Sequence, residues 1–252
     1  GAHTFPYMDI HNDTAIVDGT EGEALINPDG DVLSKYLKKR EEYLAKKAEL
    51  QKFIGKETKT ADGETLELFC NIGTPRDAKK ARECDGEGIG LFRTEFLFMD
   101  TTYYPTEEEQ FEAYKEAVET MEYRTVIIRT LDIGGDKDIP YLGLKKEENP
   151  FLGYRAVRYC LGNVEDYKIQ LRAIIRASAY GKVKIMVPLV TTVDEMRSVK
   201  KLVEEIKEEL RDEKIPFDNG IEVGCMVETA SASLIADLLA KEADFFSIGT
   251  ND

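Results

Sequence analysis

The sequence predicts an α/β fold in which parallel strands alternate with helices. Two observations support this class: short strand-like runs, several of them continuously apolar, recur from residue 66 onward, and amphipathic helical patterns separate them. Strands that are continuously apolar are typical of parallel sheets, because both faces of such sheets are covered. The expected strands are 66–72, 88–92, 125–129, 183–188, 221–227 and 245–248.

Helical periodicity fills the intervals between these strands. Thr106 and Thr192 each stand three residues before a glutamate, which is the capping-box pattern at a helix start. Six strands of this kind fit either a doubly wound sheet or a barrel of eight strands, and the periodicity leaves both open. The expected helices are 75–84, 106–121, 166–180, 192–212 and 230–241.

The N-terminal part of the chain follows a different pattern. Residues 14–27 form short β-like pieces around a glycine-containing turn, and Pro28, Asp29 and Gly30 end them. Residues 34–54 form a charged helical pattern that is polar around most of its circumference. Such a helix is typical of a connector between domains.

Composition excludes several classes of function. The net charge of −15 argues against a nucleic acid partner, because a phosphate backbone needs a basic surface. No apolar stretch approaches the roughly 20 residues that span a bilayer, so membrane insertion is not expected. The four cysteines show no metal-ligand spacing, and free thiols suit a reducing cytoplasm. Cys70 and Cys225 lie in apolar runs and are expected to be buried.

Charged side chains follow several of the predicted strands. Arg93, Arg129 and Glu228 each come at or directly after a strand end, and Asn251 and Asp252 follow the last strand. The carboxyl ends of parallel strands face the ligand crevice in either architecture. Arginine suits phosphate and carboxylate groups, and a carboxylate pair beside a phosphate suits Mg²⁺. The pattern predicts a site for a small phosphorylated anion with Mg²⁺; structural ion pairs are the alternative.

The loop after Arg129 reads "DIGGDK" and offers a further candidate. Gly134 and Gly135 permit a tight turn, and Lys137 could reach a phosphate group. A pair of glycines is also common in ordinary loops, and the spacing of a Walker motif is absent. Taken alone, this loop is weak support for a phosphate site.

Four longer motifs carry a resemblance to a known family. "GIGLFRTEFLFMD", "RTLDIGGDK", "ENPFLGYRAVR" and "DFFSIGTND" together resemble enzyme I of the bacterial phosphoenolpyruvate-dependent sugar phosphotransferase system. The resemblance extends over residues 11–252. It implies a (β/α)₈ TIM barrel of the phosphoenolpyruvate/pyruvate-binding type. Pyruvate phosphate dikinases and phosphoenolpyruvate synthases share this barrel, but their counterparts of "LDIGGDK" usually carry a Pro-Pro run.

The resemblance also implies roles for individual residues. Arg93 and Arg129 correspond to arginines that grip phosphoenolpyruvate, and Glu228 and Asp252 to ligands of Mg²⁺. Asn251 corresponds to a substrate-binding asparagine. Arg155 corresponds to a further arginine near the substrate, and Lys137 falls in the matching loop.

In the resembled family the phosphoryl group passes to a histidine on a separate domain and then to the carrier protein HPr. The resemblance thus implies a cytoplasmic transferase, typically a homodimer, that serves sugar transport. The motif around the acceptor histidine and the cysteine that protonates the enolate are both absent, and no catalytic residue is assigned. We therefore expect this chain alone to be unable to complete phosphotransfer.

The same comparison gives an expected domain organisation. Residues 1–10 resemble a remnant of recombinant expression, 11–29 the tail of the phosphohistidine domain, 30–60 a linker helix, and 61–252 a barrel truncated after about six strands. Three alternatives remain at this point. The chain could be a phosphoenolpyruvate-binding module without catalysis, a dimerisation fragment, or a barrel of the dikinase and synthase group.

Overall fold

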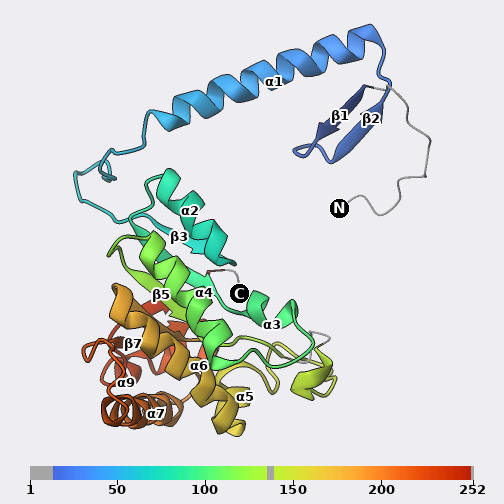
Figure 1. The fold of residues 1–252 in the computed structure, drawn as a ribbon. Helices are drawn as coiled ribbons and strands as arrows, with labels where there is room; N and C mark the ends of the chain where they lie inside the picture. Colours follow the sequence, from blue (N-terminus) through green and yellow to red (C-terminus); the bar gives the residue numbers. More distant parts are fainter. Residues whose placement is uncertain (1–13, 135–138, 251–252) are drawn as a thin grey trace. The chain divides into compact units, whose positions relative to one another are not determined.

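The computed structural model describes residues 14–134 and 139–250 of the chain (Figure 1). The chain divides into two compact units, Gly1–Lys56 and Glu57–Asp252. The first contains a hairpin and one long helix, and the second contains the predicted alternation of strands and helices.

The hairpin occupies the segment in which short β-like pieces were predicted. β1 (Ala15–Asp18) pairs antiparallel with β2 (Glu23–Ile26). The carboxylate of Asp18 accepts hydrogen bonds from the backbone N–H groups of Thr20 and Glu21, at 2.9 and 3.2 Å. These bonds satisfy two donors of the turn and hold it closed.

The long helix α1 (Gly30–Gln51) begins earlier than the predicted residue 34. Asp29 provides the start, because its carboxylate accepts a hydrogen bond from the backbone N–H of Val32 at 2.8 Å. No residue of α1 is buried within the described part of the chain. This agrees with a helix that is polar around most of its circumference.

The second unit is built on a parallel sheet of six strands. Their order in the sheet is their order in the chain, and each strand pairs in parallel with the next. A doubly wound sheet reverses its strand order at one point, so that alternative is excluded for the described strands. Sequential order is what a barrel requires, and closure by eight strands stays a prediction. The strands are β3 (Phe69–Ile72), β4 (Gly88–Arg93), β5 (Val126–Arg129), β6 (Val183–Val187), β7 (Glu222–Val227) and β8 (Phe246–Ile248).

Helices lie in the intervals between the strands, and both predicted capping boxes are present. Thr106 and Glu109 cap α4, and Thr192 and Glu195 cap α7. The helices are α2 (Pro75–Glu83), α3 (Glu95–Met99), α4 (Glu107–Thr120), α5 (Ala156–Gly162), α6 (Val164–Ala177), α7 (Val193–Asp212), α8 (Ala230–Leu234) and α9 (Ala236–Leu239). Short 3₁₀ helices lie at Pro140–Leu142, between β5 and α5, and at Ser178–Tyr180, directly after α6.

The main hydrophobic core lies between the sheet and the row of helices α2, α4, α6 and α7, which pack against one another in that order (Figure 1). The four residues predicted to be buried on the helix 166–180 are at most 1% exposed: Tyr167, Leu171, Ile174 and Ile175. Burial of this apolar stripe is the main source of stability for α6.

A smaller apolar cluster forms on the other face of the sheet. Leu91, Met186 and Met226 are its buried members, and Ile127 and Phe245 pack against them. These residues come from strands β4 to β7 and from the residue before β8. Because side chains alternate along a strand, the next residues on this face lie two positions further on.

Three expectations about this unit need correction. The predicted helix 230–241 is two short helices, because the backbone at Ile235 leaves the helical region (φ −110°, ψ 20°). The predicted strand 66–72 begins only at Phe69, where pairing with β4 starts. Cys225 is buried as expected, but Cys70 is only partly buried. It comes from the edge strand β3, which has one neighbour in the described sheet.

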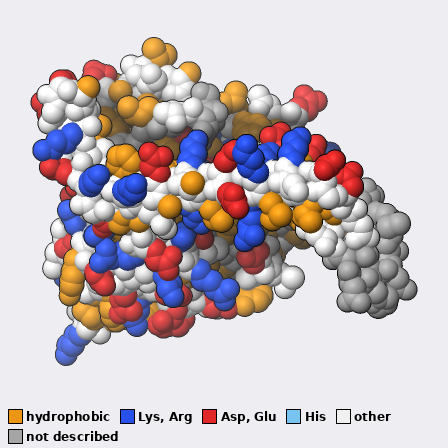
Figure 2. Space-filling model, turned by 90° about the horizontal axis from the view of Figure 1, so that it is seen from above, with side chains coloured by type: hydrophobic (Ala, Val, Ile, Leu, Met, Phe, Trp, Pro, Cys, Tyr) orange, Lys and Arg blue, Asp and Glu red, His pale blue; other side chains and the backbone are white. Residues whose placement is uncertain are grey.

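Among the described residues, no helix combines the length and the apolarity needed to cross a membrane. On the face shown in Figure 2, basic and acidic side chains are intermixed, without a continuous basic area.

Candidate phosphate and metal site

Arg93 and Arg129 lie side by side at the carboxyl ends of β4 and β5. They are direct partners in the register of these two parallel strands, and neighbouring strands are about 4.8 Å apart. Leu91 and Ile127 stand two residues earlier and belong to the smaller apolar cluster. By the alternation of side chains, both arginines therefore point to the same face as that cluster.

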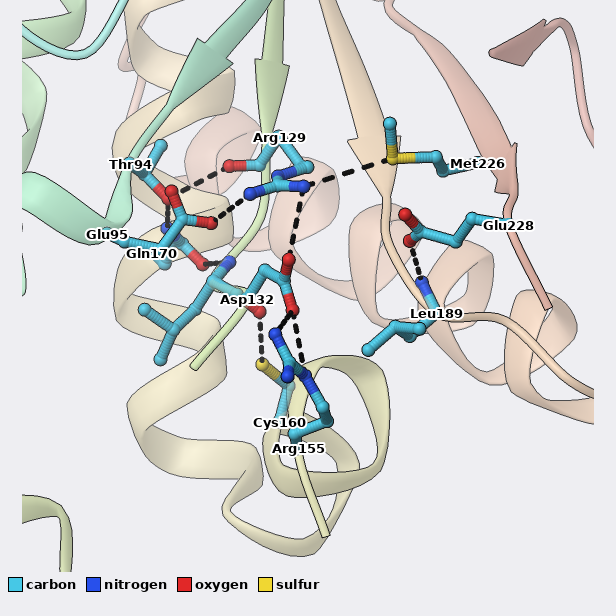
Figure 3. A network of polar contacts seen from close by, with 11 residues as sticks. Thr94, Glu95, Arg129, Asp132, Arg155, Cys160, Gln170, Leu189, Met226 and Glu228 are labelled. Carbon is cyan, nitrogen blue, oxygen red and sulfur yellow. Dashed lines mark hydrogen bonds and ion pairs between the residues drawn. The ribbon is translucent and has the colours of Figure 1, made fainter. Parts of the chain in front are cut away.

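Glu228 belongs to the same layer of the site. It stands two residues after Met226, whose side chain is in the smaller apolar cluster, and directly after the last residue of β7. Arg129, at the end of β5, contacts a residue of β7, because its Nη1 atom lies 3.9 Å from Sδ of Met226 (Figure 3). The charged layer therefore lies directly beyond the apolar one, at the carboxyl end of the sheet.

Two carboxylates hold the guanidinium of Arg129 from different sides (Figure 3). Nη2 lies 2.6 Å from Oε1 of Glu95, and Nη1 lies 3.1 Å from Oδ2 of Asp132. The other oxygen of Asp132 accepts two hydrogen bonds from Arg155, from Nη2 at 2.8 Å and from Nε at 3.2 Å. Since one carboxylate serves two guanidiniums, the four side chains form one connected network.

This network is almost entirely removed from water. The side chains of Glu95, Arg129, Asp132 and Arg155 are between 9% and 11% exposed. A single buried charge without a partner costs several kcal/mol, but here two positive and two negative groups compensate one another. The network is therefore stable only as a unit.

Burial and charge act in opposite directions on the two central residues. Burial raises the pKa of Glu95, and the neighbouring Arg129 only partly opposes this shift. Burial by itself would lower the pKa of Arg129, but the attraction of Glu95, Asp132 and Glu228 outweighs it and raises the pKa. Arg129 is thus held in its charged form by the three surrounding carboxylates.

Glu228 is oriented by the neighbouring loop. Its Oε1 atom accepts a hydrogen bond from the backbone N–H of Leu189 at 2.7 Å (Figure 3). Leu189 has a left-handed backbone with φ of +51°, a conformation that costs a residue with a side chain roughly 1–3 kcal/mol. Thr229 ties the same two loops together, because its hydroxyl donates to the carbonyl oxygen of Val190 at 2.8 Å.

Arg155 reaches the site from a separate segment. It is the N-cap residue of α5, and Ala156 after it is also left-handed, with φ of +49°. The backbone N–H of Ala156 donates to the carbonyl oxygen of Ile133 at 3.2 Å, which fixes the segment to the chain that follows β5. Beside Arg155 lies a hollow of about 180 Å³ whose walls include Phe151 and Leu189.

The residues suited to hold a metal are described only in part. Glu228 is described, whereas Asp252, Asn251 and Lys137 lie outside the described residues. Within the described ranges, no group of three or more histidine, cysteine or acidic side chains could hold a metal ion. Mg²⁺ does not need such a group, because it is commonly bound by one or two carboxylates with water and substrate oxygens. Glu228 fits that donor set.

Sequence reasoning did not identify Glu95, Asp132 and Gln170. Glu95 and Asp132 stand two and three residues after the predicted arginines, in "RTE" and "RTLD". An acid so close to a strand-end arginine was an available signal for an ion pair. Gln170 lies on the otherwise apolar side of α6, beside Tyr167 and Leu171, and it is fully buried.

Comparisons with known proteins agree with the motifs. Residues 47–252 match the family model described as "PEP-utilising enzyme, PEP-binding domain". The chain is 53% identical over 240 residues to the phosphoenolpyruvate-protein phosphotransferase of Staphylococcus carnosus (strain TM300), covering 95% of this chain and 42% of that protein. It is 52% identical over 245 residues to the protein of the same name from Priestia megaterium, covering 97% and 43%.

A third protein of that name, from Bacillus subtilis (strain 168), is 52% identical over 239 residues, covering 95% of this chain and 42% of the relative. The chain thus spans less than half the length of these relatives. The resemblance read from the four motifs is confirmed. This chain belongs to the family of PEP-utilising enzymes, as a member of its PEP-binding domain.

Proposed function

We propose that this chain binds phosphoenolpyruvate together with Mg²⁺ at the carboxyl end of its parallel sheet. In this proposal Arg93 and Arg129 hold the phosphate group, and Glu228 is a metal ligand. Arg155, Lys137 and Asn251 contribute to substrate binding, and Asp252 to both functions. The proposal extends to the reaction named for the relatives, in which phosphoenolpyruvate donates its phosphoryl group to a protein.

One observation carries the proposal. Arg93 and Arg129 are register partners on neighbouring strands, and Glu228 belongs to the same layer on the same face. Two arginines whose backbones are about one strand spacing apart can both reach a phosphate group, because each guanidinium offers a planar pair of donors. A carboxylate across from them can hold a cation that the phosphate oxygens also contact.

The charges of the described site also favour a metal. The described candidate residues include three arginines and three carboxylates, so their formal charges cancel: Arg93, Arg129 and Arg155 against Glu95, Asp132 and Glu228. Lys137 and Asp252, added from the sequence, leave this balance unchanged. Phosphoenolpyruvate carries both a phosphate and a carboxylate, so a neutral site needs a cation to bind it tightly. A divalent ion supplies that charge.

The residues of the chain then act by position and charge. Phosphoryl transfer makes few covalent demands on a protein, so stabilisation of the developing charge dominates. Arg129, fixed by Glu95 and Asp132, presents its remaining donors to the phosphate without further ordering. Bound Mg²⁺ would supply positive charge to the phosphate oxygens. The products are a phosphorylated acceptor and the enolate of pyruvate.

The acceptor, the partners and the surroundings come from the resemblance. We propose that the acceptor is a histidine on a separate domain, that HPr is the next carrier, and that the protein is a cytoplasmic homodimer. Residues 11–29 would belong to the phosphohistidine domain, 30–60 to a linker helix and 61–252 to an eight-stranded barrel. A binding module without catalysis is the second candidate, because a site of this kind can hold the ligand without an acceptor.

Calorimetry on the native protein that carries this chain tests the binding step. Titration with phosphoenolpyruvate in the presence of Mg²⁺ should give saturable binding, and removal of the metal with a chelator should weaken it. Arg129→Ala should weaken binding by about 3 kcal/mol, roughly 100-fold, because charge-assisted hydrogen bonds contribute about 1.5–3 kcal/mol each. Arg197→Ala is the control, since this arginine is 60% exposed and lies on α7.

The proposal is overturned if the wild-type protein does not bind phosphoenolpyruvate, or if Arg129→Ala binds it as well as the control does. A parallel assay for pyruvate formation separates the two candidates. Binding with pyruvate formation supports the transferase, and binding without it supports the binding module.

A further inference from the structure

Gln170 is a fully buried residue of α6, and its amide contacts the two segments that carry Arg93 and Arg129. Its Oε1 atom accepts a hydrogen bond from the backbone N–H of Leu131 at 2.8 Å. Its Nε2 atom donates to the hydroxyl of Thr94 at 3.1 Å and to the hydroxyl of Tyr114 at 3.2 Å. Gln170, Thr94 and Tyr114 are all 0% exposed.

The directions of these hydrogen bonds are determined by chemistry. A backbone N–H can only donate, so the amide must turn its oxygen to Leu131 and its NH₂ group to the two hydroxyls. The hydroxyl of Thr94 donates a hydrogen bond to the carbonyl oxygen of Arg129, at 2.9 Å. The hydroxyl of Tyr114 donates in turn to Oε1 of Gln110, at 3.1 Å. The two amide hydrogens of Gln170 and the hydroxyl hydrogens of Thr94 and Tyr114 therefore each have one acceptor.

This arrangement fixes two segments that carry the proposed site. Thr94 stands between Arg93 and Glu95, and Leu131 stands between Arg129 and Asp132 in the chain. The strand β5 ends at Arg129. The backbone N–H of Leu131, two residues later, is bonded by the side chain of Gln170 and not by a neighbouring strand. Through Thr94 and Leu131, one glutamine joins the end of β4, the segment after β5 and α6; Figure 3 draws Gln170 next to Thr94.

We infer that Gln170 is a positioning residue of the phosphate site. It does not touch the proposed ligand; it sets the backbone from which Arg129 and Glu95 reach one another. The inference rests on the proposed function, because Arg129 must bind the phosphate for its orientation to matter.

An apolar residue at this position would leave the buried backbone N–H of Leu131 without its acceptor. The same side of α6 carries Tyr167, Leu171 and Ile174, all at most 1% exposed. A buried donor that loses its acceptor costs about 1–3 kcal/mol, so Gln170 also contributes to stability. Beyond that, a buried amide with three directed hydrogen bonds specifies one arrangement of the segments it joins.

The chain contains a matched control for this inference. Gln110 on α4 is also 0% exposed and also bonds to Tyr114. Its NH₂ group donates to the carbonyl oxygen of Pro105 at 2.9 Å, which lies in the loop before α4 and carries no predicted site residue. Gln110→Met and Gln170→Met therefore remove comparable buried amides, but only the second disconnects Thr94 and Leu131.

The experiment measures the dissociation constant for phosphoenolpyruvate with Mg²⁺ and the thermal midpoint for each variant of the native protein. We expect Gln170→Met to weaken binding about tenfold, the equivalent of one charge-assisted hydrogen bond. We expect Gln110→Met to lower the thermal midpoint comparably while binding changes less than about twofold. Equal binding by the two variants would overturn the inference.

Two further variants cover the case in which Gln170→Met does not fold. Thr94→Val keeps the shape of the side chain but removes the hydroxyl, whereas Thr94→Ser keeps the hydroxyl. Weak binding by Thr94→Val with normal binding by Thr94→Ser supports the inference, and normal binding by both overturns it. Arg129→Ala separates the two levels. If it binds normally, the proposed function itself fails, and if only it binds weakly, the positioning role alone is wrong.

Discussion

Replacing Asp132 by asparagine should destabilise the second unit strongly, although the two side chains have almost the same size. Asp132 makes three charged contacts, one with Arg129 at 3.1 Å and two with Arg155 at 2.8 and 3.2 Å. An asparagine would keep one oxygen for one arginine and turn an NH₂ group toward the other. A donor would then face a donor, and the network would carry an uncompensated positive charge.

The expected cost follows from the burial of the network. Removing one partner of a buried ion pair costs about 3–5 kcal/mol. Glu95 still neutralises Arg129 in the variant, and the side chain of Asp132 is 11% exposed, so we expect the low end, about 3 kcal/mol. For a unit of this size, this corresponds to a thermal midpoint lower by about 6–12 °C.

Calorimetric and urea unfolding of the native protein provide the measurement. Asp194→Asn is the control, because this side chain is 89% exposed and its contact with Arg197 is long, at 3.4 Å. A double variant, Asp132→Asn with Arg155→Met, should lose less than the sum of the single changes, since the two residues are in contact. A loss below about 0.5 kcal/mol, typical of a surface substitution, or additive behaviour of the double variant, would refute the reasoning.

Three further outcomes are expected. The raised pKa of Glu95, caused mainly by burial, means that folding increases its affinity for a proton; this contribution to stability is present below about pH 4.5 and is lost as the pH rises through the folded pKa. Glu95→Gln should therefore gain in unfolding free energy relative to wild type as the pH rises from about 4.5 through the folded pKa, and a difference that is constant with pH would contradict this. Arg172, which contacts Glu107 at 3.1 Å and Glu209 at 3.5 Å, should contribute about 1 kcal/mol, and Arg172→Met should lose that amount at low salt but much less in 1 M salt. Asp77 has a lowered pKa, mainly because it accepts a hydrogen bond from the backbone N–H of Thr74; Asp77→Asn should cost about 0.5–1 kcal/mol at pH 7 and nothing below the folded pKa, as urea unfolding at several pH values would show.

The elements of the second unit were predictable because each depends on local pattern. An apolar run of five or six residues is enough for a buried strand. A threonine three residues before a glutamate can cap a helix start, because the two side chains bond two backbone N–H groups there. The break between α8 and α9 was not predictable in this way. The segment "SLIADLLA" continues a helical pattern, and nothing in that pattern indicates the non-helical backbone at Ile235.

That Arg93 and Arg129 lie close together was predictable for a different reason. In a parallel sheet the carboxyl ends of neighbouring strands meet at one edge, so Arg93 and Arg129 had to lie near one another in any such fold. The partners of Arg129 were not predictable to the same degree. Whether Glu95 and Asp132 turn toward the guanidinium depends on backbone directions after the strand ends, and the strand pattern says nothing about these.

The network around Arg129 weakens the electrostatic attraction of this arginine for an anion, and it fixes the position of its side chain. Glu95 and Asp132 reduce the positive charge that a phosphate group meets, and they occupy donors of both terminal nitrogens of the guanidinium. In return, Arg129 loses its rotamer freedom on folding, and about 2 kcal/mol of side-chain entropy need not be lost when the ligand binds. A site arranged in this way binds its anion by geometry more than by net charge. Under the proposed function the missing charge would enter with the ligand, and this is the physical reason to expect a divalent cation beside Glu228.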